Sequence, residues 1–268
     1  MNKELENELV CAWLEEKTES TRKNYLNSLR VFYEFSDSID VSLTTLQEYQ
    51  KHLSQRYKVS TAYRLFGVVT SLLKFARHRD YISQNVGACV RPIKPDPNEK
   101  VEERLLTVDE VKTLMDNASN ERNRIMIRTA YLLGLRIHEL LNLHWDDFFN
   151  GGNMVKVIGK GSKQRFIRVP DSLLADLKTL DTTGFIFQNR LGKPMTAPNA
   201  HIFLKKIIDR TGLNPSISWH WFRHSCATHS LKNGASPDSL RKKLGHSTIG
   251  GLGTYLHDDE DASQFLDL

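Results

Sequence analysis

Three stretches of the sequence place cationic side chains where they could hold an anion. In "LLGLRIHELLNL", Arg136 and Glu139 are three residues apart, so on a helix they share a face. In "SWHWFRHSCATH", His220 and Arg223 have the same spacing inside an otherwise apolar segment, where polar groups need partners. Lys160 stands between two glycines, where a long side chain can reach outward. An anion bound in a cleft would satisfy these groups.

A fourth stretch, "LGHSTIGGLGTYLH", carries Tyr255 nine positions after His246. Three glycines precede the tyrosine, and each costs about 1 kcal/mol inside a helix. We therefore expect a flexible support rather than a stable helix. Each feature also has an ordinary interpretation: a surface ion pair for the arginine and glutamate, and a half-buried loop residue for the tyrosine.

The elements that must position these residues divide into two domains. Residues 1–90 are predicted to be helical, because apolar residues recur at helical spacing around 25–32, 43–53 and 63–73. The stretch "RPIKPDPNEKVEER" (91–104) has three prolines in six residues and is typical of a linker. A second domain, 105–268, begins where Thr107 and Glu110 form a predicted capping box.

Most of the second domain is predicted to be helical, with one exception. The segment "NMVKVIGKGSKQRFIRVP" contains two alternating runs joined by Gly-Lys-Gly-Ser-Lys, a pattern typical of a β-hairpin. Lys160 lies in this turn. Lys163 is the alternative candidate for the same chemical role, because the sequence does not fix the register of the hairpin. The predicted fold class is mainly α, with a helical N-terminal domain and a mostly α second domain that holds a small β-hairpin or sheet.

Composition narrows the class of protein. The 268 residues are 40% hydrophobic and 26% charged, which is typical of globular domains. The acidic N-terminus lacks the apolar core of a signal peptide, and no apolar run has the length of about 20 residues that a membrane span needs. Three widely spaced cysteines argue against disulfides and zinc. We expect buried thiols, a cytoplasmic location, and neither a metal nor a cofactor.

The charge of the chain is unevenly distributed. The net charge is +5, and residues 18–94 hold twelve lysines and arginines against six acids. Such a basic region is typical of a nucleic-acid-binding surface, although an ordinary solvated surface has the same composition. The last eleven residues hold five acids and no base, so the tail 257–268 is unsuited to the DNA backbone. The candidate DNA contacts are Arg22, Lys23, Arg64, Lys74, Arg77, Arg79, Lys163 and Arg165.

Taken together, the motifs resemble those of the tyrosine recombinases of the phage-integrase superfamily. Within it, their amino-acid sequences are most similar to those of Xer recombinases. The phrases "GLRIHEL", "VIGKGSKQR", "RHSCATH" and "LGHST" carry the resemblance. It covers the whole chain, because the basic helical N-terminal region is similar to the family's core-binding domain. The positions that match the family's catalytic pattern, in its order, are Arg136, Glu139, Lys160, His220, Arg223, His246 and Tyr255.

The resemblance implies cleavage of a DNA strand through a 3′-phosphotyrosine. Tyr255 would be the nucleophile, and Arg136 and Arg223 would bind the non-bridging phosphate oxygens as planar forks. Lys160 would be the general acid, and Glu139 would orient Arg136 or a histidine. The two matching histidines, at positions 220 and 246, would donate further hydrogen bonds. Because the ester conserves the bond energy, neither ATP nor a metal is expected.

The resemblance leaves several questions open. Rejoining to a partner strand gives recombination, whereas rejoining to the same strand gives relaxation of the type IB topoisomerase kind. A DNA-binding relative without catalysis would lack at least one of the seven residues, and none is missing. The compact length favours a simple Xer-like recombinase over a mobile-element integrase. The expected partners are double-stranded DNA and further protomers, with a tetramer on synapsed DNA and a monomer in solution.

Overall fold

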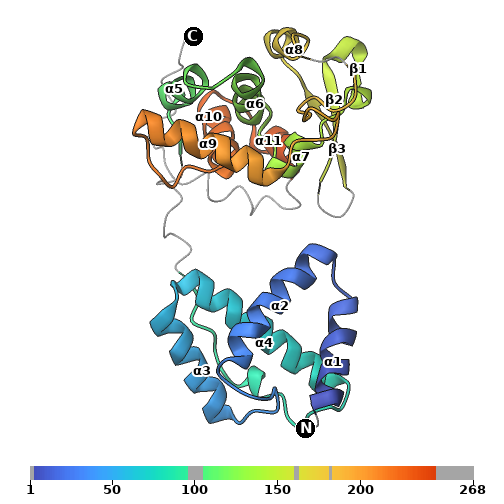
Figure 1. The fold of residues 1–268 in the computed structure, drawn as a ribbon, viewed down its shortest axis with the longest axis vertical. Coiled ribbons are helices and arrows are strands. Elements are labelled where there is room, and N and C mark those ends of the chain that lie inside the picture. Colours follow the sequence, from blue (N-terminus) through green and yellow to red (C-terminus); the bar gives the residue numbers. More distant parts are fainter. Residues whose placement is uncertain (1–2, 96–104, 160–162, 181–182, 246–268) are drawn as a thin grey trace. The chain divides into compact units, whose positions relative to one another are not determined.

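The structure is a computed structural model that describes residues 3–95, 105–159, 163–180 and 183–245 (Figure 1). The chain divides into two compact units, residues 1–99 and 100–268. Val90 is buried in the core of the first unit, and the Gln50 amide donates a hydrogen bond of 2.8 Å to the carbonyl of Arg91. The first unit therefore includes the start of the segment that the sequence predicts as a linker.

Helices build the first unit, as the sequence predicts. The segments around 25–32, 43–53 and 63–73 each form an amphipathic helix whose apolar face is buried. The aromatic core includes a stacked pair, Trp13 and Tyr25, and an edge-to-face pair, Phe32 and Tyr49. The described elements are α1 (Lys3–Glu15), α2 (Glu19–Tyr33), α3 (Leu43–Arg56), α4 (Val59–His78) and the short helix η1 (Val86–Ala88).

A buried carboxylate joins the first helix of this unit to the segment after α2. Glu6 is only 4% exposed and accepts hydrogen bonds from the Tyr33 hydroxyl (2.7 Å), the Ser38 hydroxyl (2.9 Å) and the backbone N–H of Ile39 (3.0 Å). Because each buried oxygen has a donor, the charge is tolerated in the interior. Burial raises the pKa of the Tyr33 hydroxyl, and its hydrogen bond to Glu6 raises this pKa further.

The second unit combines helices with one small sheet. The predicted capping box of Thr107 and Glu110 is confirmed at the start of its first helix. The described helices are α5 (Val108–Asp116), α6 (Glu121–Leu133), α7 (Ile137–Leu141), α8 (Asp171–Leu177), α9 (Ala197–Thr211), α10 (Trp219–Lys232) and α11 (Pro237–Leu244), with short helical turns η3 (Trp145–Asp147) and η4 (Asn150–Gly152).

The predicted β-hairpin is confirmed. Strands β2 (Met154–Ile158) and β3 (Gln164–Arg168) pair antiparallel, with Ile158 opposite Gln164. A short strand β1 (Phe148–Phe149), which the sequence did not indicate, adds to the other edge of β2 and completes a three-stranded sheet in the order β1-β2-β3. The prediction of a mainly α protein with a small sheet is therefore confirmed.

The packing around α11 brings the separate motifs together. In Figure 1, α11 lies between β3 and α10, and it contacts both. Helix α6 ends at Gly134, which has a left-handed backbone (φ +62°). A Cβ atom at this position would lie 2.7 Å from Leu244 Cδ2, so the absence of a side chain lets α11 approach the end of α6.

Candidate active site

Glu139 is the centre of the candidate site. Arg136 precedes α7 as its N-cap residue, and Glu139 is the third residue of the helix. The Glu139 carboxylate accepts hydrogen bonds from the Arg136 backbone N–H (2.9 Å) and from Arg136 Nη1 (3.0 Å). The predicted contact between the two side chains is therefore present. The Arg136 side chain remains 37% exposed, whereas that of Glu139 is 5% exposed.

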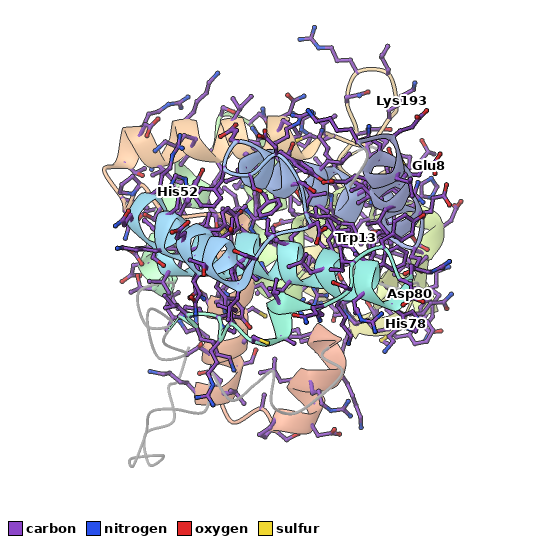
Figure 2. The ribbon with its side chains drawn as sticks, turned by 90° about the horizontal axis from the view of Figure 1, so that it is seen from below. Glu8, Trp13, His52, His78, Asp80 and Lys193 are labelled. Carbon is purple, nitrogen blue, oxygen red and sulfur yellow. The ribbon has the colours of Figure 1, made fainter. Side chains whose placement is uncertain are left out.

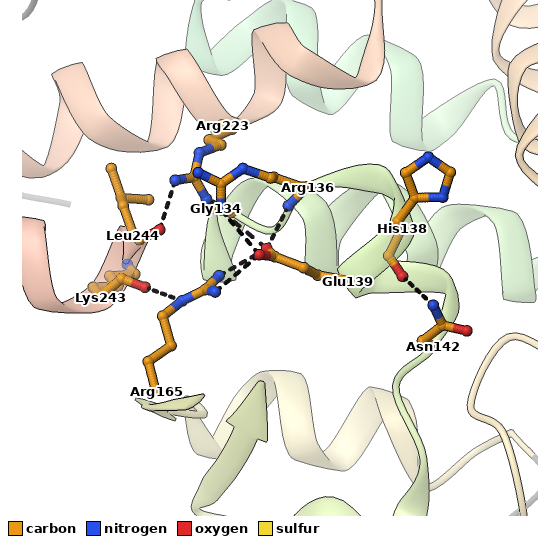
Figure 3. Close-up of polar contacts among 9 residues, drawn as sticks. All are labelled: Gly134, Arg136, His138, Glu139, Asn142, Arg165, Arg223, Lys243 and Leu244. Carbon is orange, nitrogen blue, oxygen red and sulfur yellow. Dashed lines mark hydrogen bonds and ion pairs between the residues drawn. The ribbon is translucent and has the colours of Figure 1, made fainter. Parts of the chain in front are cut away.

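Two more arginines reach this carboxylate from other elements (Figure 3). Arg165, on β3, donates from Nη1 to Oε1 (2.9 Å) and from Nη2 to Oε2 (2.7 Å) of Glu139. Arg223, on α10, has its Nη1 at 4.0 Å from Oε2. Bidentate arginine–carboxylate pairing of this kind is both strong and geometrically specific. A single carboxylate thus organises three guanidinium groups.

Helix ends supply the remaining acceptors. Arg223 is 3% exposed and donates to the carbonyl of Gly134 (2.8 Å) and to the carbonyl of Leu244 (2.6 Å). Arg165 Nε donates to the carbonyl of Lys243 (2.8 Å). The last carbonyls of a helix have no partner within the helix and carry its partial negative charge. The ends of α6 and α11 therefore help to offset a cluster that holds three cations and one anion.

The electrostatics favour an ionised Glu139. Burial acts to raise the pKa of its carboxyl group, but hydrogen bonds from Arg165, together with those from Arg136, outweigh this effect. The pKa of Glu139 consequently lies below its ordinary value of 4.5. The cluster keeps a net positive charge near neutral pH, which suits it to bind an anion.

Three of the candidate catalytic residues, Lys160, His246 and Tyr255, lie outside the described residues, and so does the tail 257–268. The described chain neighbours of Lys160 and His246, which are Gly159 and Gly245, border the arginine–glutamate cluster. A Cβ atom at Gly159 would lie 3.4 Å from both Arg165 Nη1 and Glu139 Oε1. At Gly245, which caps α11, it would lie 3.0 Å from Arg165 Cδ.

The histidines of α10 differ in their surroundings. His220 lies in the first turn and is exposed, with its ring edge-to-face against that of His224 at 4.9 Å. His229 is half-buried, and its Nδ1 lies 2.7 Å from the Tyr131 hydroxyl. Burial, followed by the charge of Lys232, lowers the pKa of His229. The contacts of His229 are those of a helix-packing residue.

The expectation of an exposed, DNA-facing Arg165 needs correction. Its side chain is 9% exposed and forms a two-pronged ion pair with Glu139, so its guanidinium is engaged inside the protein. The physical reason is the strand alternation: Arg165 has the same parity as the buried residues Ile167 and Val169. Lys163 is exposed, and its carbonyl accepts from the Gly159 N–H at 2.8 Å.

The candidate DNA contacts of the first unit are exposed, and several have partners in the protein. Arg22 donates to the carbonyls of Glu15 and Lys17 at the end of α1. Arg64 donates to the Ser28 hydroxyl at 2.9 Å. Lys23 and Lys74 lie on α2 and α4. DNA contact by these four side chains stays a prediction.

The end of α4 carries the two other candidates of this unit. Arg77 pairs with Asp80 at 2.6 Å, and the Arg79 guanidinium lies over the Phe75 ring at 5.3 Å. Figure 2 shows His78 and Asp80 at this end of the helix. The Arg77–Asp80 pair is exposed, and exposed pairs contribute at most about 1 kcal/mol. Arg77 could exchange its carboxylate partner for a phosphate at little cost.

Two kinds of feature are absent from the described part of the chain. No group of three or more His, Cys, Asp or Glu residues there could hold a metal ion. Within the same residues, no helix is long and apolar enough to cross a membrane.

Comparison with known proteins defines the class. The profile of the phage integrase family matches residues 104–262, and the chain belongs to this family. It is 30% identical to the tyrosine recombinase XerD of Corynebacterium glutamicum over 84% of this chain and 81% of that protein. It is also 28% identical to the tyrosine recombinase XerC of Halalkalibacterium halodurans, over 89% of this chain and 86% of that protein.

Solved structures share the fold. The integrase of the Tn1549 transposon, in complex with transposon right-end DNA, matches with a TM-score of 0.78 and 18% identity over 94% of this chain and 96% of that one. The site-specific recombinase XerH, bound to its difH substrate, matches with a TM-score of 0.70 and 20% identity over 89% of this chain and 76% of that one. At these identities the likeness concerns the fold alone.

Proposed function

We propose that the chain is a site-specific DNA recombinase in which Tyr255 attacks a phosphodiester and forms a 3′-phosphotyrosine. The observation that carries this proposal is the cluster of Arg136, Arg165 and Arg223 around Glu139. This cluster borders the residues next to Lys160 and His246. Preorganised cations of this kind stabilise the charge that develops on a phosphoryl group during transfer. Membership in the phage integrase family supports the same reaction.

Each candidate has a defined task in the proposed reaction. Arg136 is held by Glu139 but remains partly exposed, so its guanidinium can bind non-bridging oxygens. Arg223 would contribute the second guanidinium, and His220 and His246 would donate hydrogen bonds. An unperturbed tyrosine has a pKa near 10, so only about one in a thousand is ionised at pH 7, and a tyrosine nucleophile needs a group that accepts its proton. His220 is a candidate for accepting its proton.

The proposed cleavage step exchanges one phosphate ester bond for another, so it needs no external energy source. The Tyr255 oxygen forms a bond to phosphorus, the bond from phosphorus to the 5′-oxygen breaks, and Lys160 supplies the proton to that oxygen. The products are a 3′-phosphotyrosine and a free 5′-hydroxyl. Attack of a 5′-hydroxyl from a partner strand reverses the step and completes recombination, so the reaction needs no ATP. The guanidinium groups would stabilise the charge on the phosphoryl group, which is the task of a metal in other phosphoryl-transfer sites.

The proposed substrate is double-stranded DNA with a specific recombination site, and the proposed location is the cytoplasm. The N-terminal unit, with its basic residues, would contribute to DNA binding. The related proteins XerC and XerD favour an Xer-like role, such as resolution of chromosome or plasmid dimers, whereas the transposon integrase represents the mobile-element alternative. A lambda integrase tetramer has been solved on a Holliday junction, which supports a tetrameric synapse here.

The test is capture of the covalent intermediate. The protein is incubated with supercoiled plasmids that carry candidate chromosomal sites, in excess EDTA, and both adducts and recombinant junctions are sequenced. We expect 3′-linked adducts at one short site and junctions that exchange strands there. Relaxation without junctions would instead indicate a topoisomerase, and binding without any adduct would contradict a catalytic function.

Lys160 has a substrate-specific prediction. We expect Lys160→Ala to slow cleavage of ordinary DNA by about 10²–10⁴-fold, because the leaving 5′-oxygen loses its proton donor. A 5′-phosphorothiolate substrate should restore most of the rate, because sulfur leaves without a proton. The measurement is single-turnover adduct formation on both substrates. Equal loss on both would exclude Lys160 as the general acid, and Lys163→Ala would then be tested in the same assay.

The tail supplies a prediction about assembly. Phe265, Leu266 and Leu268 end an otherwise acidic segment, and we propose that it docks on a neighbouring protomer when DNA gathers the subunits. Deletion of residues 260–268 should leave a solution monomer and single-site binding unchanged but reduce cooperative assembly and alter the cleavage rate. Native gels and sedimentation measure both. Synapsis and cleavage like those of the full chain would show that the tail has no docking role.

A further inference from the structure

Arg165 connects three elements of the second unit through one guanidinium group. The residue lies on β3, its two terminal nitrogens bind Glu139 of α7, and its Nε binds the Lys243 carbonyl of α11. The side chain is 9% exposed, so these bonds lie largely away from water. A planar fork can make all of these bonds at once, whereas the ammonium group of lysine cannot reproduce their geometry.

The same side chain packs against two glycines that precede candidate catalytic residues. Gly159 comes before Lys160, and a Cβ there would lie 3.4 Å from Arg165 Nη1. Gly245 comes before His246, and a Cβ there would lie 3.0 Å from Arg165 Cδ. Gly159 and Gly245, each the last described residue before a candidate catalytic residue, therefore both lie beside Arg165.

Glu139 connects Arg165 to Arg136 and Arg223, the two candidates for binding the phosphate. Its carboxylate binds Arg136 at 3.0 Å and lies 4.0 Å from Arg223, and the same two oxygens accept the bonds from Arg165. We propose that Arg165 is a positioning residue. It fixes Glu139 and the end of α11, and so holds the candidate catalytic groups around them in fixed positions relative to one another. This inference rests on the proposed function. It assigns Arg165 no contact with DNA.

The first test compares Arg165→Lys and Arg165→Met with Arg168→Ala. Arg168 lies on the same strand but is exposed, and so it serves as the control. We expect both Arg165 variants to slow covalent adduct formation by about 100-fold, because small displacements of catalytic groups have effects of this size. The dissociation constant for DNA should change by less than about threefold, because no phosphate contact is removed. Arg168→Ala should leave the cleavage rate at saturating protein unchanged.

A pH profile separates positioning from general damage. Among the described residues, the charged groups that face Glu139 are Arg136, the N-cap residue of α7, Arg165 from β3 and Arg223 from α10. Loss of the Arg165 hydrogen bonds should raise the pKa of Glu139. The cleavage rate of Arg165→Met should therefore begin to fall at a higher pH than that of the wild type. An acidic limb that does not move would overturn an action through Glu139.

A substitution at Gly245 disturbs Arg165 without removing its charge, and the same substitution at Gly212 is the control. Gly245 and Gly212 both cap helices in a left-handed conformation, at φ +68° and +67°. A Cβ at Gly245 would press on Arg165 Cδ at 3.0 Å, whereas a Cβ at Gly212 would have no neighbour within 4 Å. We expect Gly245→Ala to slow adduct formation by at least about tenfold more than Gly212→Ala, although both carry the same backbone strain.

The outcomes separate the two proposals. If the wild type forms no adduct at any site, the proposed function fails. If the wild type cleaves and the Arg165 variants match its rate, the positioning role fails while the function stands. The role would also be overturned if the Arg165 variants lost DNA affinity and thermal stability together with cleavage. Such a result would indicate that Arg165 is needed only for folding.

Discussion

Tyr255→Phe will abolish covalent capture on a nicked DNA substrate and leave DNA binding largely intact. The substitution keeps the aromatic ring and removes only the oxygen that we propose attacks phosphorus, so the rate of adduct formation should fall by about 10⁴-fold or more. The dissociation constant should stay within about twofold, because the oxygen adds little to the many phosphate contacts. Denaturing gels measure the adduct, and fluorescence anisotropy measures binding.

The control for this experiment is a tyrosine elsewhere in the same unit. Tyr131 is half-buried, and its hydroxyl contacts His229 at 2.7 Å. Tyr131→Phe should retain covalent capture, because this oxygen has a packing partner and no place in the proposed reaction. Persistent adducts in Tyr255→Phe would show that another residue attacks, and mass spectrometry of the linked peptide would identify it.

Glu139→Ala will produce the largest loss of stability that we expect in the second unit. Removing the carboxylate leaves the buried guanidinium groups of Arg165 and Arg223 without their shared anion. Breaking a buried ion pair in this way costs about 3–5 kcal/mol. For a unit of this size, a loss of 3 kcal/mol lowers the thermal midpoint by about 6–12 °C. Calorimetry measures the midpoint, and adduct formation should be lost as well.

A second glutamate provides the matched control. Glu110 and Glu139 are both the third residue of a capped helix, and Glu110 accepts from the Thr107 N–H at 2.7 Å. Glu110→Ala removes only a helix cap, so its cost should be about 1 kcal/mol. Equal effects of the two substitutions would contradict a central role for Glu139.

The acid dependence of stability follows from the same carboxylate. The pKa of Glu139 is lower in the folded state than its ordinary value of 4.5, so its ionisation stabilises the fold fully above pH 4.5. This contribution to the free energy of unfolding disappears as the pH falls through the folded-state pKa. Glu139→Gln lacks the titration. The difference in free energy of unfolding between wild type and Glu139→Gln should therefore shrink below pH 4.5. A constant difference down to low pH would contradict the charged pair.

Much of the fold could be predicted because its signals are local. The helical periodicity around 25–32 and 63–73 predicted α2 and α4, and alternation around a glycine-rich turn predicted the hairpin. The capping box of Thr107 and Glu110 marked the start of α5. Strand β1 was missed because a two-residue strand is too short to show a period.

The site was harder to predict because its partners are distant in the chain. The pairing of Arg136 with Glu139 could be seen from their spacing, but nothing local predicts that Arg223 binds the carbonyls of Gly134 and Leu244. Arg165 did carry a signal: in "RFIRVP" it alternates in phase with the apolar residues that face the core. Its positive charge suggested exposure, and the buried carboxylate that it needs lies 26 positions earlier.

The dispersed origin of the cluster has a consequence for the order of folding. Arg223 and the Gly134 carbonyl are 89 positions apart in the chain, so their bond closes a long loop and exists only when the end of α6 and α10 are packed together. A partly folded chain, in which these helices have not yet packed, therefore lacks the assembled arginine–glutamate cluster. In a DNA recombinase, this dependence couples the proposed capacity to cut to completion of the fold of the second unit.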